Sequence, residues 1–519
     1  MANAEYTRID ESTYSHANMS HRHPVEINDN YPTYQVAAVE ETSGEAAELS
    51  IDDAIERLGM GKFQHRILWA AGLCFAADSM EILLLSFLAV VWKAEFHLTD
   101  TQTSTISFSV FMGALVGSLI LGTLGDIIGR RPVFSLAACI ISVFGLCTAL
   151  ANSYSALLAV RFFVGFGVGG LTVPFDTLSE FLPTSHRGVN LLIIEYFWTG
   201  GSLLVPIFAY LSLGNNSSGS WQLFVVLCAI PCVISSILGM LVVTESPRWL
   251  CARERSDEAL TILRNAARTN GHDPFIIFPE GTVLATREEH STICDLLSPQ
   301  WKWITLRLWG AWCGFAFIYY GTILAITLIF SSNSYEAQQN GTYHFDYTAI
   351  FASSSAELVG LTLVIVTVDT IGRIPSQAIC YICGGLSVFL MCLFASMKAH
   401  RGILLSFSFL SRLFMMGATC LTWVSTSEIL STEIRTTGHA VANAIARIGG
   451  SLSPFIISER TPLLAIGIIM FCISLVTARF TSKLPETKGV AMGAGAKTQK
   501  NTPTVHSETE LVLASSEII

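Results

Sequence analysis

The sequence predicts an all-α membrane protein in which twelve transmembrane helices form two six-helix bundles related by a pseudo-two-fold axis. Hydrophobic residues make up 51% of the 519 residues and charged residues only 13%, whereas a soluble domain is about a quarter charged. The deficit is concentrated in stretches of about 20 residues, the length of helix that crosses a bilayer core. Within lipid such a stretch must satisfy its own backbone hydrogen bonds, so we expect it to be helical. A sequence repeat, described below, relates the two sets of helices.

Twelve apolar stretches divide into two sets of six. We expect the spans at 66–92, 103–124, 132–150, 154–182, 189–213, 221–243, 303–330, 347–367, 375–397, 402–427, 437–457 and 462–480. The predicted organisation is a disordered acidic cytosolic tail at 1–49, a first bundle at 50–243, a cytosolic central loop at 244–302, a second bundle at 303–480 and a cytosolic tail at 481–519.

Two short helices are expected outside the membrane. Ser50 has the spacing of a capping residue for a helix at 51–58, which Gly59 would end. Ser256 is the expected cap of a second helix at 257–269, within the central loop.

The distribution of Lys and Arg predicts that both termini are cytosolic. The loops after spans 2 and 4 and the central loop are basic, whereas the loops after spans 3, 5 and 7 contain neither Lys nor Arg. Basic residues accumulate in cytosolic loops. Four residues depart from this distribution, namely Lys93, Lys398, Arg401 and Arg460.

Candidate glycosylation sites agree with this orientation. Asn215, Asn216 and Asn340 begin Asn-X-Ser/Thr sequences in the loops after spans 5 and 7. Both loops are predicted to be non-cytosolic, as glycan addition requires.

The 13 cysteines have no metal-binding or redox pattern. Cys380 and Cys383 have CxxC spacing, but inside a membrane span this spacing favours small packing residues. No cysteine lies in a predicted outer loop, so we expect no disulfide. Without a metal-binding or redox pattern, we also expect no metal site and no cofactor.

Three matches relate the two halves of the sequence. Residues 179–187 (SEFLPTSHR) match 427–435 (SEILSTEIR), and residues 126–130 (DIIGR) match 369–373 (DTIGR). Arg161 and Arg412 also correspond, near the start of each fourth span. Parallel repeats of six helices predict a binding site between the halves at mid-depth.

Several of these segments resemble the major facilitator superfamily. GTLGDIIGRRP and RFFVGFGVGG resemble its loop 2–3 and fourth-helix motifs, and TESPRWL at 244–250 and LPETKG at 484–489 resemble sugar-porter motifs. Within that group the chain resembles synaptic-vesicle-related (SVOP-like) and niacin-transporter-like proteins in SIDDAIERLGMGKFQ, ADSMEILLLSF, SEFLPTSHRG, LLIIEYFW and YYG at 319–321. The resemblance covers residues 50–490 and implies alternating-access transport.

The chain departs from these motifs at three places. Thr244 stands where the ESPR motif usually has proline, and the second-half loop motif lacks a second basic residue after Arg373. The external loop at 331–346 is short, unlike the large luminal loop of synaptic vesicle glycoproteins.

The repeated acidic and basic residues at the predicted cytosolic helix ends form a hypothetical conformational latch. Exposed ion pairs are worth only about 0–1 kcal/mol each, but several that form in one state of the transport cycle would bias the transition. The alternative is that they are static interface anchors. The latch residues are Asp126, Arg130, Glu180, Arg187, Asp369, Arg373, Glu428 and Arg435.

Ionisable residues near the middle of a span are candidate transport residues, since each costs about 2.5–3.5 kcal/mol on insertion scales. Asp78 and Glu81 are three residues apart on span 1 and would share one helix face. Two close carboxylates favour proton uptake. The alternative is a structural ion pair with an Arg elsewhere.

The remaining candidates for binding substrate or protons lie on other spans. Arg447 shares a face with His439 and Asn443 and suits a carboxylate substrate; its alternative is a salt bridge to Glu357. The aromatic candidates are also compatible with simple packing. The remaining set is Asp176, Glu195, Trp198, Tyr319, Tyr320, Glu357 and Arg447.

The predicted function is secondary active, proton-coupled transport of a small organic ion such as a nicotinate-like acid. Alternatives are a sugar or polyol transporter and a non-transporting vesicle membrane protein. The expected partners are the solute, protons and bilayer lipid, with no nucleic acid. We expect a monomer in the plasma membrane or an intracellular vesicle membrane. An enzyme is not expected, because the sequence has no nucleotide-binding loop, metal cluster or nucleophile constellation.

Overall fold

The computed structural model describes residues 48–214, 220–285, 293–332 and 344–488, and for 184–189, 432, 433 and 436 it describes the backbone alone. The first half contains α2 (Lys62–Glu95), α3 (Asp100–Ile128), α4 (Arg130–Thr148), α5 (Tyr154–Gly169), α6 (Thr172–Phe181), α7 (Thr184–Leu213) and α8 (Trp221–Val242). The second half contains α13 (Lys302–Ile329), α15 (Tyr347–Ile371), α16 (Arg373–Ser396), α17 (Arg401–Ile429), α18 (Thr432–Ile456) and α19 (Leu463–Thr481).

Eleven of these spans are long and apolar enough to cross a membrane, with α5 and α6 counted as one. The twelfth, α18, is less apolar because His439, Asn443 and Arg447 recur along it at helical spacing. It nevertheless packs lengthwise between α13 and α3. The predicted all-α fold with twelve spans is confirmed.

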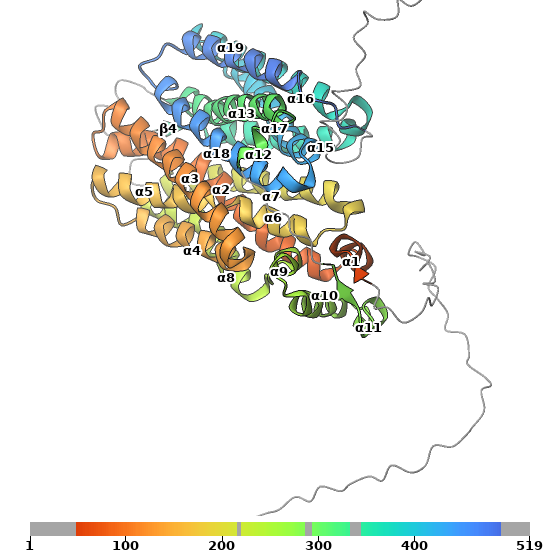
Figure 1. The fold of residues 1–519 in the computed structure, drawn as a ribbon. Helices are drawn as coiled ribbons and strands as arrows, with labels where there is room; N and C mark the ends of the chain where they lie inside the picture. The colour runs from red at the N-terminus through yellow and green to blue at the C-terminus, as the bar shows by residue number, and fades with distance from the viewer. Residues whose placement is uncertain (1–47, 215–219, 286–292, 333–343, 489–519) are drawn as a thin grey trace, which may run out of the picture. The chain divides into compact units, whose positions relative to one another are not determined.

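The two halves repeat the same packing. In the first half α2 packs on α7 and α8, α3 packs on α5, and α4 packs on α5 and α8. The equivalent helices of the second half make the equivalent contacts, α13 with α18 and α19, α15 with α17, and α16 with α17 and α19. Figure 1 shows the first half in orange and yellow beside the second in green and blue. The halves meet mainly where α3 packs on α18 and α7 on α15.

The fourth span is interrupted, which the sequence did not predict. α5 ends at Gly169 and α6 begins at Thr172. The glycines before the break allow α5 to approach its neighbours closely, since a Cβ on Gly165 would lie 2.0 Å from the Val110 carbonyl oxygen of α3. A Cβ on Gly169 would lie 2.3 Å from the carbonyl oxygen of Ala114. The break therefore follows a stretch of α5 that is closely packed on α3.

Short elements lie outside the spans. They are β1 (Glu48–Leu49), α1 (Ile51–Leu58), α9 (Pro247–Ala252), α10 (Ser256–Asn270), α11 (Pro274–Ile277), β2 (Val283–Leu284), α12 (Ile293–Leu296), β3 (Ser331–Ser332) and β4 (His344–Phe345). β1 pairs with β2 in parallel and β3 with β4 antiparallel. We call the end of the bundle that carries α1, α9 and α10 the inner end, and the opposite end the outer end.

The short helices agree with the sequence except in two details. Ser50 Oγ accepts the N–H of Asp53 at 3.1 Å and begins α1, which Gly59 ends with φ +65°. Ser256 lies inside α10 and Arg255 takes the cap position, so the predicted cap is one residue late. The predicted tail 1–49 includes Glu48 and Leu49, which the structure places in β1 because they pair with the central loop.

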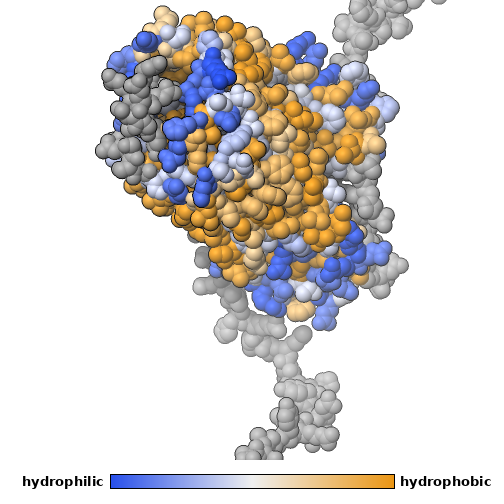
Figure 2. Space-filling view, turned by 90° about the vertical axis from the view of Figure 1, so that its left-hand side faces the viewer, coloured by the Kyte–Doolittle hydropathy of each residue, from blue (hydrophilic) through white to orange (hydrophobic). Residues whose placement is uncertain are grey.

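The outer surface of the spans is apolar, as contact with lipid tails requires. Figure 2 shows a broad hydrophobic face between two hydrophilic regions. Side chains such as Leu211, Leu241 and Val366 are 66–77% exposed on this surface. A soluble protein would bury most of these side chains, so the exposure supports a membrane location.

Candidate functional site

A cavity lies between the two halves. Residues from α2, α6 and α7 form one wall and residues from α13, α17 and α18 form the other. The break between α5 and α6 contributes Leu171. The lining residues are Phe75, Asp78, Leu171, Thr172, Glu195, Trp198, Phe315, Tyr319, Tyr320, Thr419, Trp423, Asn443 and Arg447.

Two carboxylates lie in the wall formed by the first half, Asp78 from α2 and Glu195 from α7. Both residues are more than 90% buried. Within the described part of the chain, the Glu195 carboxylate makes neither a hydrogen bond nor an ion pair, although the backbone carbonyl of Glu195 accepts Thr199 Oγ1. A buried carboxylate is usually stabilised by a partner. Because the Glu195 carboxylate lacks one, it offers an unused hydrogen-bond acceptor to the cavity.

Arg447 supplies the cationic group of the opposite wall. Its Nη1 donates to the Tyr320 hydroxyl at 3.1 Å. Its Nη2 lies 3.9 Å from Asp78 Oδ2, which is too long for a hydrogen bond. The other oxygen of Asp78 is buried without a hydrogen-bond partner. Arg447 and Asp78 therefore face each other across the interface without a direct hydrogen bond.

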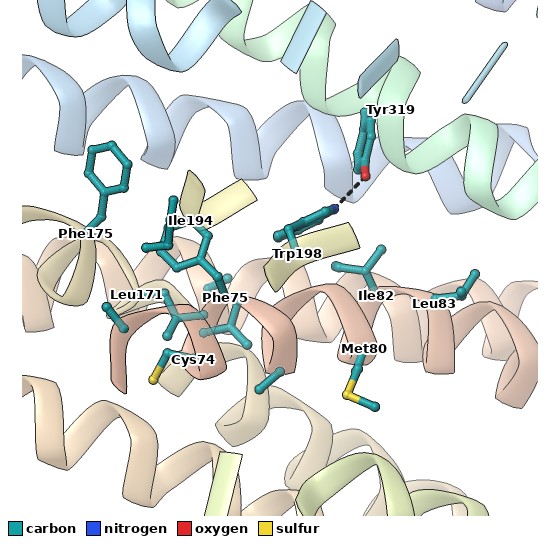
Figure 3. Packing of buried hydrophobic residues seen from close by; sticks show 14 of the residues in the cluster. Cys74, Phe75, Met80, Ile82, Leu83, Leu171, Phe175, Ile194, Trp198 and Tyr319 are labelled. Atoms are coloured by element: carbon teal, nitrogen blue, oxygen red, sulfur yellow. Dashed lines mark hydrogen bonds between the residues drawn. The ribbon is translucent and has the colours of Figure 1, made fainter. Parts of the chain in front are cut away.

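Aromatic rings form much of the remaining wall. Six of the lining residues are aromatic, three of them from α13; five of the six are buried and Trp423 is half-buried. Figure 3 shows Trp198 on α7 directed toward Tyr319 on α13, and the indole N–H donates to the Tyr319 hydroxyl at 2.7 Å. Such rings offer apolar area and negatively polarised faces to a bound ion.

Glu357 is buried in a polar network behind this wall. The Tyr319 hydroxyl donates to Glu357 Oε1 at 2.7 Å, and Ser202 Oγ of α7 donates to Oε2 at 2.8 Å. Arg412 Nη2 lies 3.2 Å from Oε1. The alternative that Arg447 forms a salt bridge to Glu357 is therefore wrong, because Arg412 of the neighbouring span α17 pairs with that carboxylate. The network joins the halves, since Ser202 and Trp198 belong to the first and the others to the second.

Glu81 does not share the cavity with Asp78. Its carboxylate lies 2.5 Å from Arg161 Nη2 of α5, inside the first half, and neither side chain is more than 5% exposed. The structure therefore separates the expected pair of carboxylates and has the structural ion pair instead. Residues three apart on a helix differ by about 60° in direction, and α2 is buried almost all round, so the two carboxylates face different neighbours.

Asp176 also lies away from the cavity lining. It is a neighbour of Arg130, Glu180 and Asp126 near the inner end. The sequence could not distinguish these places, because Asp176 and the cavity residue Thr172 are one helical turn apart on α6.

His439 and Asn443 share one face of α18, as predicted, but have different surroundings. Asn443 lines the cavity. The His439 ring packs at 4.6–5.6 Å, centroid to centroid, among the rings of Phe175, Trp312 and Trp423. This aromatic cluster joins the two halves on the inner side of the cavity.

Six of the eight latch residues form two equivalent sets of ion pairs, one in each half. In the first half Arg130 pairs with Asp126 at 2.7 Å and lies 3.4 Å from Glu180. In the second half Arg373 makes the equivalent contacts with Asp369 at 2.7 Å and Glu428 at 3.2 Å. These pairs lie within each half in this state. Arg435 is half-buried, and the side chain of Arg187 lies outside the described residues, as do Asn215, Asn216 and Asn340.

Two carboxylates that were not among the predicted site residues complete these sets. Glu245 accepts the backbone N–H of Arg130 at 2.7 Å, and Glu486 accepts that of Arg373 at 2.9 Å, each at a helix N-terminus that follows a glycine with positive φ. Burial disfavours the Glu486 carboxylate, but backbone N–H donors outweigh this effect and lower its pKa. The sequence contains a signal for both carboxylates, because Glu245 and Glu486 each lie in a sugar-porter-like motif that follows the last span of its half.

A third set of ion pairs joins the halves at the outer end. Lys93 of α2 pairs with Glu459, and also with Asp100 at 2.6 Å. Arg460 lies 2.8 Å from Asp100, and Ser104 Oγ donates to the Pro454 carbonyl at 2.8 Å. Lys93 and Arg460 departed from the predicted charge distribution, and the structure gives both of them acidic partners. The contacts of Glu459 with Lys93, of Arg460 with Asp100 and of Ser104 with Pro454 therefore hold the two halves together at the outer end.

The chain is similar to known membrane transporters along most of its length. The model of the family "Sugar (and other) transporter" matches residues 35–494. The "Synaptic vesicle 2-related protein" of Xenopus laevis is 31% identical over 424 residues, covering 78% of this chain and 75% of that protein. The "Organic cation/carnitine transporter 7" of Arabidopsis thaliana is 30% identical over 464 residues, covering 82% and 89%.

The fold is also that of a solved transporter. The xylose transporter XylE from E. coli, in a partially occluded inward-open conformation, superposes with a TM-score of 0.64 at 19% identity, covering 83% of this chain and 100% of that one. Sequence, internal repeat and fold agree, and the fold is that of transporters and not of enzymes. The chain belongs to the sugar (and other) transporter family, as a major facilitator protein of the sugar-porter-like group and similar to the synaptic vesicle 2-related proteins.

Proposed function

We propose that this transporter carries a small organic ion with an ammonium group, and that it does so by proton-coupled alternating access. The observation that carries the proposal is the unpaired Glu195 carboxylate in a cavity lined by six aromatic rings. A cationic group between these rings gains both an ion pair and cation–π contacts. The similarity to an organic cation/carnitine transporter supports this substrate class.

Arg447 extends the proposal to substrates that also carry a carboxylate. It is the cationic side chain among the cavity lining residues, and its contact with Asp78 is long at 3.9 Å. A planar guanidinium with an unused edge suits a carboxylate. A zwitterion with its ammonium group at Glu195 and its carboxylate at Arg447 would form an ion pair with each wall of the cavity.

A nicotinate-like acid is the second candidate, and Arg447 is the observation that favours it. Glu195 and Asp78 disfavour a substrate that is only anionic, because two carboxylates face the same cavity. A sugar is less suitable, because a neutral sugar needs many neutral hydrogen-bonding partners. Besides the tyrosines and tryptophans, the lining residues of this kind are Thr172, Thr419 and Asn443. A non-transporting vesicle protein would leave the unpaired Glu195 without a role.

Proton coupling is assigned to Asp78. One of its oxygens has no partner and the other lies near Arg447. Protonation of Asp78 would remove the charge that faces Arg447 and so release the guanidinium for substrate. In the proposed orientation the inner end and both termini are cytosolic, in a plasma or vesicle membrane, and the transporter acts as a monomer.

The proposal is tested by uptake into proteoliposomes that contain the purified protein. The panel contains carnitine, tetraethylammonium, nicotinate and xylose, each with and without an inward proton gradient. We expect carnitine and tetraethylammonium to accumulate and xylose not to. Uptake of nicotinate alone would favour the second candidate, and uptake of xylose alone would refute the proposal.

Replacing Asp78 by Asn is expected to abolish the stimulation by the proton gradient, because an amide cannot exchange the proton. Exchange of substrate between two equal pools, which needs no net proton movement, should persist. The measurement is the ratio of uptake with and without the gradient. If the ratio of the variant equals that of the wild type, Asp78 does not carry the proton.

Replacing Lys93 by Gln is expected to loosen the outer end, because it removes the Lys93–Glu459 ion pair that bridges the halves, together with the Lys93–Asp100 pair within the first half. The pairs are partly exposed, so each is worth about 0–1 kcal/mol and exchange should rise only a few-fold. Hydrogen–deuterium exchange of residues 93–104 and 454–463 measures this. The control is Arg401→Gln at the same end, which breaks a pair within the second half, where Arg401 hydrogen bonds lower the pKa of Asp346 to about 2. Equal changes in both variants would contradict the bridging role.

A further inference from the structure

A second recess lies on the outside of the first half, at its inner end and away from the cavity. It is an open recess between α2 and α8. Its lining combines three basic residues with three apolar ones. They are Lys62, His65, Arg66, Trp69, Leu238 and Val242, and we call this recess the α2–α8 groove.

The groove has a basic end and an apolar end. The residues from α2 recur at i, i+3, i+4 and i+7, which places them on one helix face. α2 begins at Lys62 and α8 ends at Val242, so the basic residues lie at the membrane boundary. Trp69 is seven residues further along α2, about 10 Å toward the membrane middle. It is 58% exposed and packs edge-on against Phe197 of α7.

The basic side chains have unused binding capacity. Lys62 and Arg66 are exposed, and among the described residues neither makes a side-chain ion pair or hydrogen bond. His65 Nδ1 is held by the Gly61 carbonyl at 2.7 Å, which fixes the ring in the groove. Three basic groups within little more than one helical turn form a concentrated positive site beside an apolar floor.

We propose that the α2–α8 groove binds one anionic phospholipid molecule. The phosphate lies among Lys62, His65 and Arg66, and an acyl chain follows Trp69, Leu238 and Val242 into the bilayer. Charge complementarity and the continuity of the floor with the apolar belt identify the occupant. Basic recesses between spans on the cytosolic side suit anionic head groups. The site does not depend on the transported substrate.

Binding is measured on the full-length protein in neutral detergent by native mass spectrometry. The probes are dioleoyl phosphatidylglycerol and dioleoyl phosphatidylcholine, which share their acyl chains. We expect one tightly held phosphatidylglycerol per protein, bound about 10- to 30-fold more weakly by the Lys62→Gln/Arg66→Gln variant, which loses two charges. The control, Arg479→Gln/Lys483→Gln, removes two exposed basic residues at the inner end of α19 and should bind as the wild type does.

A second variant tests the apolar floor without a change of charge. Val242→Trp fills the groove and should weaken phosphatidylglycerol binding by a similar factor, which also decides the matter if the charge variant fails to fold. Equal losses in the control pair would overturn the proposal in favour of diffuse attraction. Equal binding of phosphatidylcholine, or of the deacylated head group glycerophosphoglycerol, would overturn it as well.

Discussion

Replacing Glu195 by Gln is expected to lower the uptake of carnitine or tetraethylammonium by about 10- to 100-fold. A hydrogen bond or ion pair to a charged group is worth about 1.5–3 kcal/mol, and each 1.4 kcal/mol is tenfold in affinity. The carboxylate is unpaired in the cavity, so its loss removes attraction for the substrate without breaking a contact that supports the fold. Initial rates of uptake into proteoliposomes, over a range of substrate concentrations, measure the effect.

The matched control is Glu258→Gln, the same chemical change on the exposed surface of α10, far from the cavity. The control should transport as the wild type does. An undiminished rate in Glu195→Gln, or an equal loss in both variants, would remove Glu195 from the binding site.

A variant of Arg447 extends the same experiment, because its effect should differ between the two substrates. Arg447→Gln should weaken uptake of carnitine, which has a carboxylate, more than uptake of tetraethylammonium, which has none. Equal losses for both substrates would mean that Arg447 supports the cavity through Tyr320 and does not touch the substrate.

The spans and the internal repeat could be predicted because their signals are local. The length of each apolar run matches the thickness of the membrane core. The two Asp-x-x-Gly-Arg segments indicate that equivalent turns occur in the two halves. Gly129 and Gly372 have φ of +110° and +108°, a conformation that glycine adopts readily. The structure confirms the spans within a few residues.

The partners of buried charges could not be predicted, because they depend on which helix faces meet. Glu81 pairs with a residue 80 positions away, and Glu357 with one 55 positions away. No periodicity in the sequence distinguishes the neighbours of either acid. The unpaired state of Glu195 is likewise a result of packing between α7 and the second half.

The aromatic lining was predicted only in part for a different reason. Trp198, Tyr319 and Tyr320 are candidates because they lie in segments that resemble known transporters. Phe75, Phe315 and Trp423 also line the cavity but lie outside those segments. Phenylalanines are frequent in every span, so composition cannot select those that face the cavity. The break at Gly170 was missed because glycines are tolerated in membrane helices.

The two repeated arginines use acids from different helices, which makes the halves unequal. Arg161 pairs with Glu81 inside the first half. Arg412 pairs with Glu357, which also accepts a hydrogen bond from the Ser202 hydroxyl of the opposite half. The second pair is therefore connected to the cavity through Tyr319 and Trp198. We infer that the first pair mainly holds its bundle together and that the second can respond to the substrate.

Replacing Arg161 by Met is accordingly expected to destabilise the protein by about 3–5 kcal/mol, because it leaves the Glu81 carboxylate buried without its partner. The double variant Glu81→Leu/Arg161→Met should recover most of this loss, since an apolar pair of similar volume removes the uncompensated charge. Unfolding of the detergent-solubilised protein by titration with SDS measures both, and Arg479→Met, an exposed arginine on α19, is the control. A double variant no more stable than Arg161→Met would show that shape, and not charge, is what the first bundle requires at this position.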